Sequence, residues 1–189
     1  DACLAKGDIS AAQQHVSRAL QAYQGIAQRD PADANSRLNI ACTHAQIGDT
    51  RARSGDTAGA LESYTVATEI CESLLQEHHD NLPALNNLSC MLLRLGAMHA
   101  QSARPDEAMR CYERNLQVQQ RLLDQSPSDV TQRRGLSVAL GRLGDVCLQQ
   151  ARIDEAIRYY EDSLKIADSL AEATPGDRRA QRDLYVSLG

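Results

Sequence analysis

A Leu-Gly pair opens the stretch LGDVCLQQARIDEAIRYY, residues 143–160, in which Ala156 follows the glycine by twelve residues and Tyr160 follows it by sixteen. These features recur at a constant interval of forty-eight residues, as Leu95-Gly96, Ala108 and Tyr112 and as Ile47-Gly48, Ala60 and Tyr64. Gly7, Gly55, Ala103 and Ala151 form another series at the same interval. This self-similarity predicts repeats at 7–54, 55–102, 103–150 and 151–189, the last incomplete, with 1–6 as the end of a preceding helix.

Each repeat is expected to form two helices, which makes the chain all-α. Apolar residues of the last repeat lie three and four positions apart, as on one stripe of a helix: Ile153, Ala156, Ile157, Tyr160, Leu164, Ala167, Leu170 and Ala171. Gly144 lies within the preceding helix, where Ala would favour the helix by about 1 kcal/mol. We therefore expect Gly144 to allow close approach of the next helix, with the small Ala156 as its partner.

The predicted helix starts carry capping residues. Asp30-Pro31-Ala32-Asp33, Ser126-Pro127-Ser128-Asp129 and Thr174-Pro175-Gly176-Asp177 each offer an N-cap, a proline at the first helical position and a carboxylate three residues after the cap. Pro105 with Asp106 and Glu107, and Ile153 with Asp154 and Glu155, place negative charge at the positive end of a helix. These signals predict inner helices near 31–53, 79–101, 127–150 and 175–189, and outer helices near 8–29, 56–77, 105–124 and 153–173.

These residues resemble the tetratricopeptide repeat (TPR), whose motif has Leu-Gly in its first helix, Ala twelve residues later and an aromatic residue four further on. The unit of 48 residues is longer than the usual repeat of about 34. Two heptads, one in each helix, account for the difference, because seven residues are close to two turns. The resemblance implies a right-handed α-α superhelix, a solenoid of antiparallel helix hairpins.

Leu85-Asn86-Asn87-Leu88-Ser89 and Leu93-Arg94-Leu95-Gly96 further resemble the long-helix TPRs of kinesin light chains and bacterial signalling proteins. In that group an asparagine of the inner helix contacts the backbone of a bound peptide. The resemblance places Asn39 and Asn87 at that position, while Gly135 and Asp183 replace asparagine in the later repeats.

Stacked hairpins are expected to line a concave groove with their inner helices. The inner segments carry a formal charge of +3 and the outer segments −8. An extended protein segment with acidic character is therefore the preferred ligand, and exposed arginines that are merely solvated are the alternative. The candidate groove residues are Asn39, Asn87, Arg94, Arg134, Arg142, Asp49 and Asp145.

Other functions are disfavoured by composition and spacing. A net charge of −5 argues against nucleic-acid binding, and no apolar run approaches the length of a membrane span. The six cysteines form no Cys-x-x-Cys pair and are expected to be free, packed thiols. His78-His79 lacks companion ligands, so no metal site is expected. No phosphate loop or nucleophile elbow occurs, and we expect neither catalysis nor a cofactor.

Two functions stay open: a peptide-binding groove, and a structural spacer or self-association module of a larger regulatory protein. Asp1-Ala2-Cys3-Leu4 aligns with Asp145-Val146-Cys147-Leu148, and Gly189 aligns with Gly141 inside a helix. A fragment of a longer, cytoplasmic protein is therefore expected. Apolar repeat ends would then be exposed, which predicts weak self-association.

Overall fold

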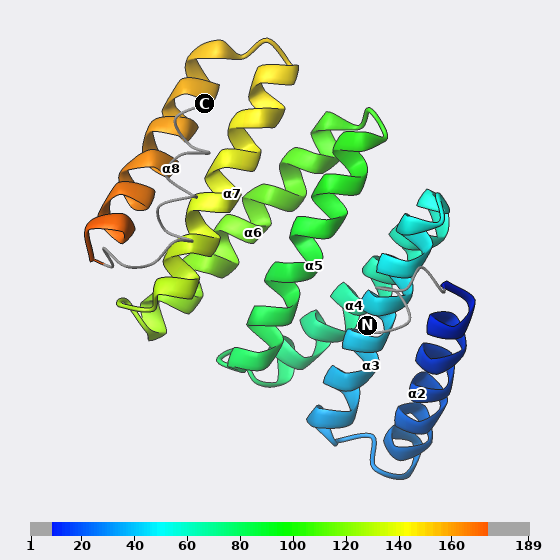
Figure 1. Ribbon diagram of the computed structural model, residues 1–189. Coiled ribbons are helices and arrows are strands. Elements are labelled where there is room, and N and C mark those ends of the chain that lie inside the picture. Colours follow the sequence, from blue (N-terminus) through cyan, green and yellow to red (C-terminus); the bar gives the residue numbers. More distant parts are fainter. Residues whose placement is uncertain (1–8, 174–189) are drawn as a thin grey trace. The chain divides into compact units, whose positions relative to one another are not determined.

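The computed structural model describes residues 9–173, and their side chains from residue 14 onward. This part of the chain contains seven α-helices and no strand (Figure 1). The helices are α2 (Ile9–Arg29), α3 (Ala34–Arg53), α4 (Thr57–Glu77), α5 (Leu82–Gln101), α6 (Pro105–Gln125), α7 (Val130–Gln149) and α8 (Ile153–Ala173). The prediction of an all-α chain of helix hairpins is confirmed for this region. The inner helix predicted at 175–189 lies outside the described residues.

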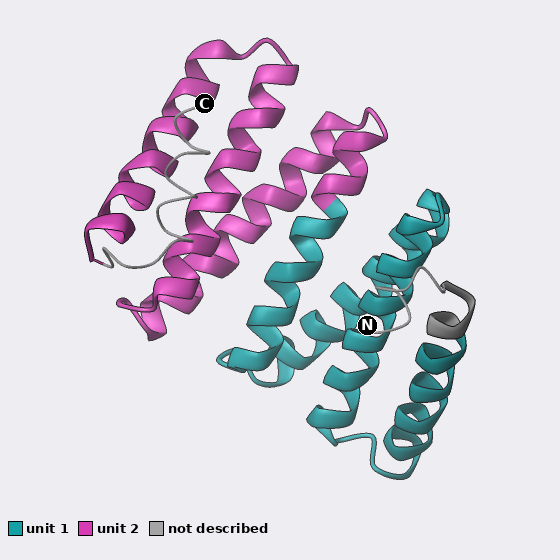
Figure 2. Ribbon diagram, viewed as in Figure 1, with its two compact units in different colours: residues 1–95 teal, residues 96–189 magenta. Residues whose placement is uncertain are grey.

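The chain divides into two compact units, residues 1–95 and 96–189 (Figure 2). In the first unit α3 packs against α2 on one side and against α4 on the other. In the second unit α7 packs in the same way between α6 and α8. Each unit therefore repeats one local arrangement, in which an inner helix lies between two outer helices.

The inner helices begin three residues later than the sequence predicted. Asp33 and Asp129 are the N-caps of α3 and α7, and their carboxylates accept the backbone N–H of Asn35 at 3.0 Å and of Thr131 at 2.7 Å. Asn81 has the same role before α5, where its Oδ1 accepts the N–H of Ala84 at 3.0 Å. The aspartates expected after the cap are thus the caps themselves, because a short carboxylate satisfies the free N–H groups of the first turn. The prolines lie in the preceding turns.

Each inner helix ends in a turn with one left-handed residue. These residues are Gly55, Ala103 and Ala151, with φ of 82°, 55° and 59°. In each case the next residue donates its N–H, at 2.9 Å, to a carbonyl five positions earlier, as in Asp56 N–H to Arg51 O. This bond closes the helix C-terminus and turns the chain into the outer helix. The outer helices α6 and α8 then begin at Pro105 and Ile153, as predicted.

The Leu-Gly motif packs differently from our expectation. A Cβ added to Gly144 would lie 2.6 Å from Cε1 of Tyr160, and one added to Gly48 would lie 2.4 Å from the same atom of Tyr64. The tyrosine ring, sixteen residues after the glycine, is therefore the group that needs the space. The atoms nearest to the space beside Gly144 belong to Tyr160 and not to the expected partner Ala156, which is buried. This contact fixes where each tyrosine hydroxyl emerges beside the inner helix.

Candidate functional site on the inner helices

The predicted groove residues lie on the inner helices, and we call the sides that carry them the inner faces. Asn39 and Asp49 are on α3, and Asn87 and Arg94 are on α5. Arg134, Arg142 and Asp145 are on α7. Asn39 and Arg142 are exposed, and the others are half-buried.

In the first unit Asp49 binds both Tyr64 and Arg94, and the three residues form a cluster. The carboxylate of Asp49 accepts Nε of Arg94 at 2.8 Å and Nη2 of Arg94 at 3.1 Å. The hydroxyl of Tyr64 donates to the same carboxylate at 2.7 Å. Burial, followed by this hydrogen bond, raises the pKa of Tyr64 well above its usual value. Arg94 is therefore already neutralised by a neighbouring helix, which the sequence did not predict.

A second contact joins the same two inner helices. The thiol of Cys42 on α3 donates to Oδ1 of Asn87 on α5 at 3.5 Å. Cys42 and Asn87 are 45 residues apart, as are Asp49 and Arg94, and the two contacts lie seven residues apart on each helix. Seven residues are about two helical turns. The inner faces of α3 and α5 thus lie side by side and hold Asn87 in a defined position.

The second unit repeats only part of this cluster. The hydroxyl of Tyr160 donates to Oδ1 of Asp145 at 2.9 Å, which matches the bond between Tyr64 and Asp49. Nη1 of Arg142 donates to Oδ2 of Asp145 at 3.1 Å, but this pair lies within α7. The side chain of Arg142 is 56% exposed, against 38% for Arg94. Arg142 is therefore the more accessible cation.

Gly135 stands where the earlier repeats have Asn39 and Asn87. A Cβ at Gly135 would lie 2.4 Å from Nε2 of Gln119, whose side chain is 4% exposed. The side chain of Gln119 thus fills the space beside Gly135. The asparagine series ends at this repeat, where an outer-helix amide occupies the adjoining volume.

Two arginines that the sequence analysis missed tie inner to outer helices. Arg37 on α3 donates to Ser73 Oγ at 2.8 Å and to both carboxylate oxygens of Glu77 at 2.7 Å. Arg133 on α7 donates to Ser169 Oγ in the same way. Arg133 and Ser169 follow Arg37 and Ser73 by two repeat lengths, so a comparison at that offset would have revealed this pair.

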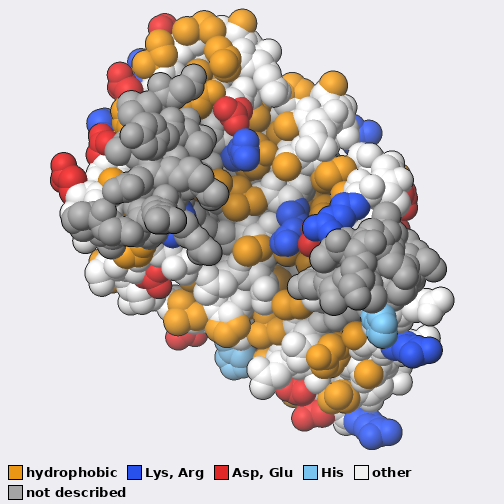
Figure 3. All heavy atoms as spheres, in the orientation of Figure 1, with side chains coloured by type: hydrophobic (Ala, Val, Ile, Leu, Met, Phe, Trp, Pro, Cys, Tyr) orange, Lys and Arg blue, Asp and Glu red, His pale blue; other side chains and the backbone are white. Residues whose placement is uncertain are grey.

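Figure 3 shows how charged and hydrophobic side chains of the described residues are distributed on one face. On the displayed face of each unit, hydrophobic side chains are scattered, with Lys and Arg side chains singly or in small groups among them (Figure 3). This distribution suits polar and apolar contacts with a protein chain better than it suits a phosphate backbone.

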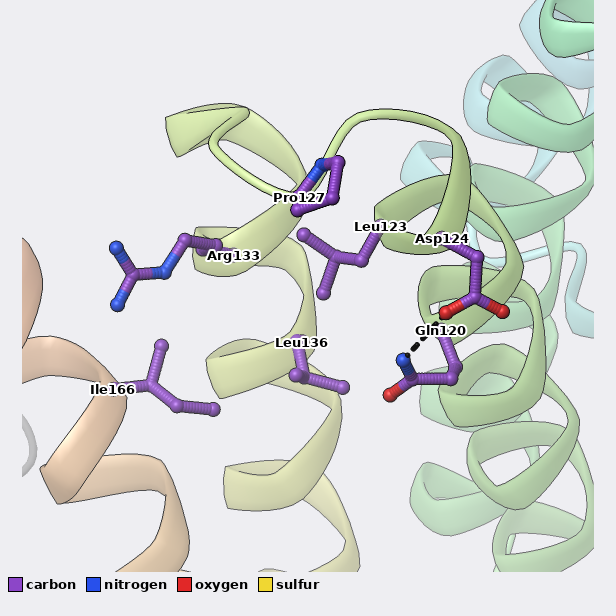
Figure 4. Close-up of a pocket in the computed structure, with 7 residues that line it drawn as sticks. All are labelled: Gln120, Leu123, Asp124, Pro127, Arg133, Leu136 and Ile166. Carbon is purple, nitrogen blue, oxygen red and sulfur yellow. Dashed lines mark hydrogen bonds between the residues drawn. The ribbon is translucent and has the colours of Figure 1, made fainter.

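A recess of about 460 Å³ lies among the helices of the second unit (Figure 4). It is lined by Gln120, Leu123, Asp124, Pro127, Arg133, Leu136 and Ile166. Nε2 of Gln120 donates to Oδ1 of Asp124 at 3.0 Å across one wall. None of the predicted groove residues lines this recess, so it is separate from the inner-face clusters.

Except for Cys42, the histidines and cysteines within residues 9–173 lie outside the inner-face clusters described above. No three His, Cys, Asp or Glu side chains there are grouped for a metal ion. His78 and His79 are exposed at the end of α4. Cys71 and Cys147 are buried free thiols, and Cys90 is exposed; Cys3 lies outside the described part. In this same region no helix is long and apolar enough to cross a bilayer.

Comparison with known proteins agrees with this architecture. Residues 87–169 match the family model described as tetratricopeptide repeat. Residues 87–169 therefore carry tetratricopeptide repeats. Helices of 20 and 21 residues fit the long-helix form of the repeat.

One solved structure shares the fold of this chain. BtubC (BKLC) from P. vanneervenii aligns over 95% of this chain and 72% of its own, with a TM-score of 0.61 and 16% identity. A MamA protein covers 88% of this chain and 90% of its own at 14% identity, with a TM-score of 0.46. At 16% identity the likeness to BtubC concerns the fold alone. A search of curated proteins by sequence found no match.

Proposed function

We propose that this TPR chain is a non-catalytic interaction module that binds an extended segment of a partner protein along its inner faces. Tetratricopeptide repeats generally mediate protein–protein interaction or scaffolding, and proteins with this repeat are typically not enzymes. The finer assignment, to the inner faces, rests on one observation. Asn39 and Arg142 are exposed there, and the hydroxyls of the buried Tyr64 and the half-buried Tyr160 hold the carboxylates of Asp49 and Asp145 in place. Such preorganised groups lose little entropy on binding.

The charge of the inner faces supports a partner segment with some acidic residues. The inner segments carry +3 and the outer segments −8, so an acidic chain is repelled less by the inner side. Arg94 contributes little to this preference because Asp49 pairs with it through two hydrogen bonds. Arg142 has one bond to Asp145 and greater exposure, and it is the stronger candidate for contact with a partner.

Selection of random peptides displayed on phage, followed by affinity measurement on variants, tests this function. Asn87→Ala and Arg142→Gln should each weaken the selected peptides by about tenfold, because each removes a hydrogen bond to a desolvated group. Glu62→Gln and Asp162→Asn, on outer helices, should leave affinity unchanged. Loss of affinity only in the outer-helix variants, or the absence of any selected binder, would reject the proposal. Far-UV circular dichroism of each variant checks that the helices remain folded.

A second function, self-association as part of a structural spacer, has its own support. Leu148, Ile153 and Ile157 in the second unit are 52%, 49% and 49% exposed. Ile153 and Ile157 are four residues apart and share one face of α8. Light scattering over a range of concentrations should show mass increasing for the parent chain and not for Ile157→Lys. A monomer at every concentration would exclude this function.

A further inference from the structure

The first unit shows what a complete inner-face cluster contains. Asp49 is followed 15 residues later by Tyr64, whose hydroxyl it accepts, and 45 residues later by Arg94, whose guanidinium it accepts twice. One carboxylate therefore satisfies a buried phenol and an arginine from the next inner helix. One repeat length further along the chain, the corresponding positions of the second unit hold Ala97, Tyr112 and Arg142. Tyrosine and arginine are kept, but the carboxylate is replaced by a methyl group.

In both clusters the tyrosine ring packs against a glycine of the inner helix. A Cβ on Gly96 would lie 2.4 Å from Cε1 of Tyr112, as a Cβ on Gly48 would from Cε1 of Tyr64. The hydroxyl of Tyr112 must therefore emerge beside Ala97 as that of Tyr64 emerges beside Asp49. Tyr112 is 2% exposed, yet within residues 9–173 its hydroxyl has no hydrogen-bond partner, unlike those of Tyr64 and Tyr160.

Arg142 is near enough to act with Tyr112. Burial raises the pKa of Tyr112 to about 12, while the positive charge of Arg142 opposes this rise and the negative charge of Asp145 adds to it. Of the guanidinium nitrogens of Arg142, only Nη1 forms a hydrogen bond in the described structure, to Asp145. Nε and Nη2, the two nitrogens that Arg94 uses to hold Asp49, are available on Arg142.

We infer that Ala97, Tyr112 and Arg142 form a receptor for a side-chain carboxylate, an Asp or Glu of the partner segment that takes the place of the missing aspartate. The tyrosine hydroxyl donates to one oxygen of this carboxylate and the guanidinium donates to it from the other side. A tyrosine whose ring is buried and whose hydroxyl lacks a protein acceptor favours an incoming acceptor, so a carboxylate there gains more than one bound at a solvated arginine. This inference rests on the proposed inner-face function and specifies its chemistry.

Three N-acetylated peptides test the receptor directly by NMR, with isotope-labelled tyrosine rings and arginine side chains in the protein. The probes are Ac-Ala-Ala-Asp-Ala-Ala-NH2, its Asn counterpart, and Ac-Ala-Ala-Ala-Ala-Ala with a free C-terminal carboxylate. The Asp peptide should shift the signals of Tyr112 and Arg142 saturably, about tenfold more tightly than the Asn peptide, as expected for charge-assisted hydrogen bonds. Equal affinity of the Asp and Asn peptides would overturn the inference, and tighter binding of the C-terminal peptide would overturn its assignment to a side chain.

Variants of Ala97 and Arg142 test whether the missing carboxylate at residue 97 causes the preference for the Asp peptide. Ala97→Asp should abolish the Asp preference, because the new carboxylate occupies the receptor from within. Arg142→Gln should lose the preference and serves as a second test if Ala97→Asp does not fold. An undiminished preference in Ala97→Asp or in Arg142→Gln contradicts the receptor. If phage-selected peptides still require Asn87 while this preference is absent, the inner-face function stands and the carboxylate receptor alone fails.

Discussion

Arg94 on α5 reaches the carboxylate of Asp49 on α3, with its Nε 2.8 Å from Oδ1 and its Nη2 3.1 Å from Oδ2. The two residues are 45 positions apart in sequence, and their pair joins two inner helices. Both residues were expected from the sequence to contact a ligand, but in the structure they bind each other. In the first unit the carboxylate of Asp49 occupies this position on the inner face. In the second unit the corresponding residue is Ala97, which has no carboxylate.

Removal of the Asp49 carboxylate should destabilise the first unit. Asp49→Ala leaves the buried hydroxyl of Tyr64 and the guanidinium of Arg94 without their acceptor, a loss of about 1–2 kcal/mol. Urea unfolding followed by circular dichroism measures the change. Asp162→Ala, which removes only an exposed pair with Lys165, is the control and should unfold like the parent chain. Equal midpoints for both variants would show that the cluster adds nothing to stability.

Glycines of the inner helices should separate into two classes. Gly144→Ala places a methyl group against the ring of Tyr160 and should destabilise the chain by about 1–3 kcal/mol. Gly141→Ala, three residues earlier in α7, meets nothing closer than Ser163 Oγ at 3.9 Å and should stabilise it by about 0.5–1 kcal/mol. Thermal unfolding of both variants checks the signs. A stabilising Gly144→Ala would refute the close-packing role of the motif.

In the turns that follow the inner helices, exchanging Ala and Gly should change stability in opposite directions at Ala151 and Gly55. Ala151 has a φ of 59°, a region that glycine enters at lower cost than alanine, and Ala151→Gly should stabilise the chain by about 0.5–1 kcal/mol. Gly55→Ala, at a φ of 82°, should destabilise it by about 1 kcal/mol. The midpoints of urea unfolding measure both. Changes of the same sign in the two variants would contradict this explanation of the turn.

Ionisation of Tyr160 should lower the free energy of unfolding at alkaline pH. Burial, the larger cause, and the hydrogen bond to Asp145, the smaller cause, raise the pKa of Tyr160 to about 12. A tyrosine in the unfolded chain has a pKa of about 10. Because the folded state holds this proton more tightly, the stabilisation is present below about pH 10 and is lost as pH rises towards about 12. The difference in unfolding midpoint between the parent chain and Tyr160→Phe should therefore shrink over that interval. A difference that stays constant would exclude this linkage.

Sequence periodicity predicted most of the fold because each repeat uses the same local chemistry. The outer helices α6 and α8 begin at Pro105 and Ile153 as expected, since a proline or an acidic first turn leaves little choice of start. The inner helices begin later because Asp33 and Asp129 compete successfully for the free N–H groups. Periodicity fixed the spacing of the helices but did not show which polar group would cap them.

The candidate site was predictable only as a set of positions. The seven groove residues do lie on inner helices, but the pairing of Arg94 with Asp49 depends on the lateral distance between neighbouring inner helices. That distance cannot be read from one repeat. Gly135 was recognised as a departure from asparagine, while the side chain of Gln119 that fills the adjoining space comes from an outer helix. Whether these residues bind a partner stays a prediction.

Amide hydrogen exchange of the chain with and without a phage-selected peptide tests the central proposal most directly. Binding along the inner faces predicts slower exchange in α3, α5 and α7, with unchanged exchange in α2, α4, α6 and α8. Protection confined to the outer helices, or to the turns between them, would contradict it and would place the partner on the opposite side of the repeats.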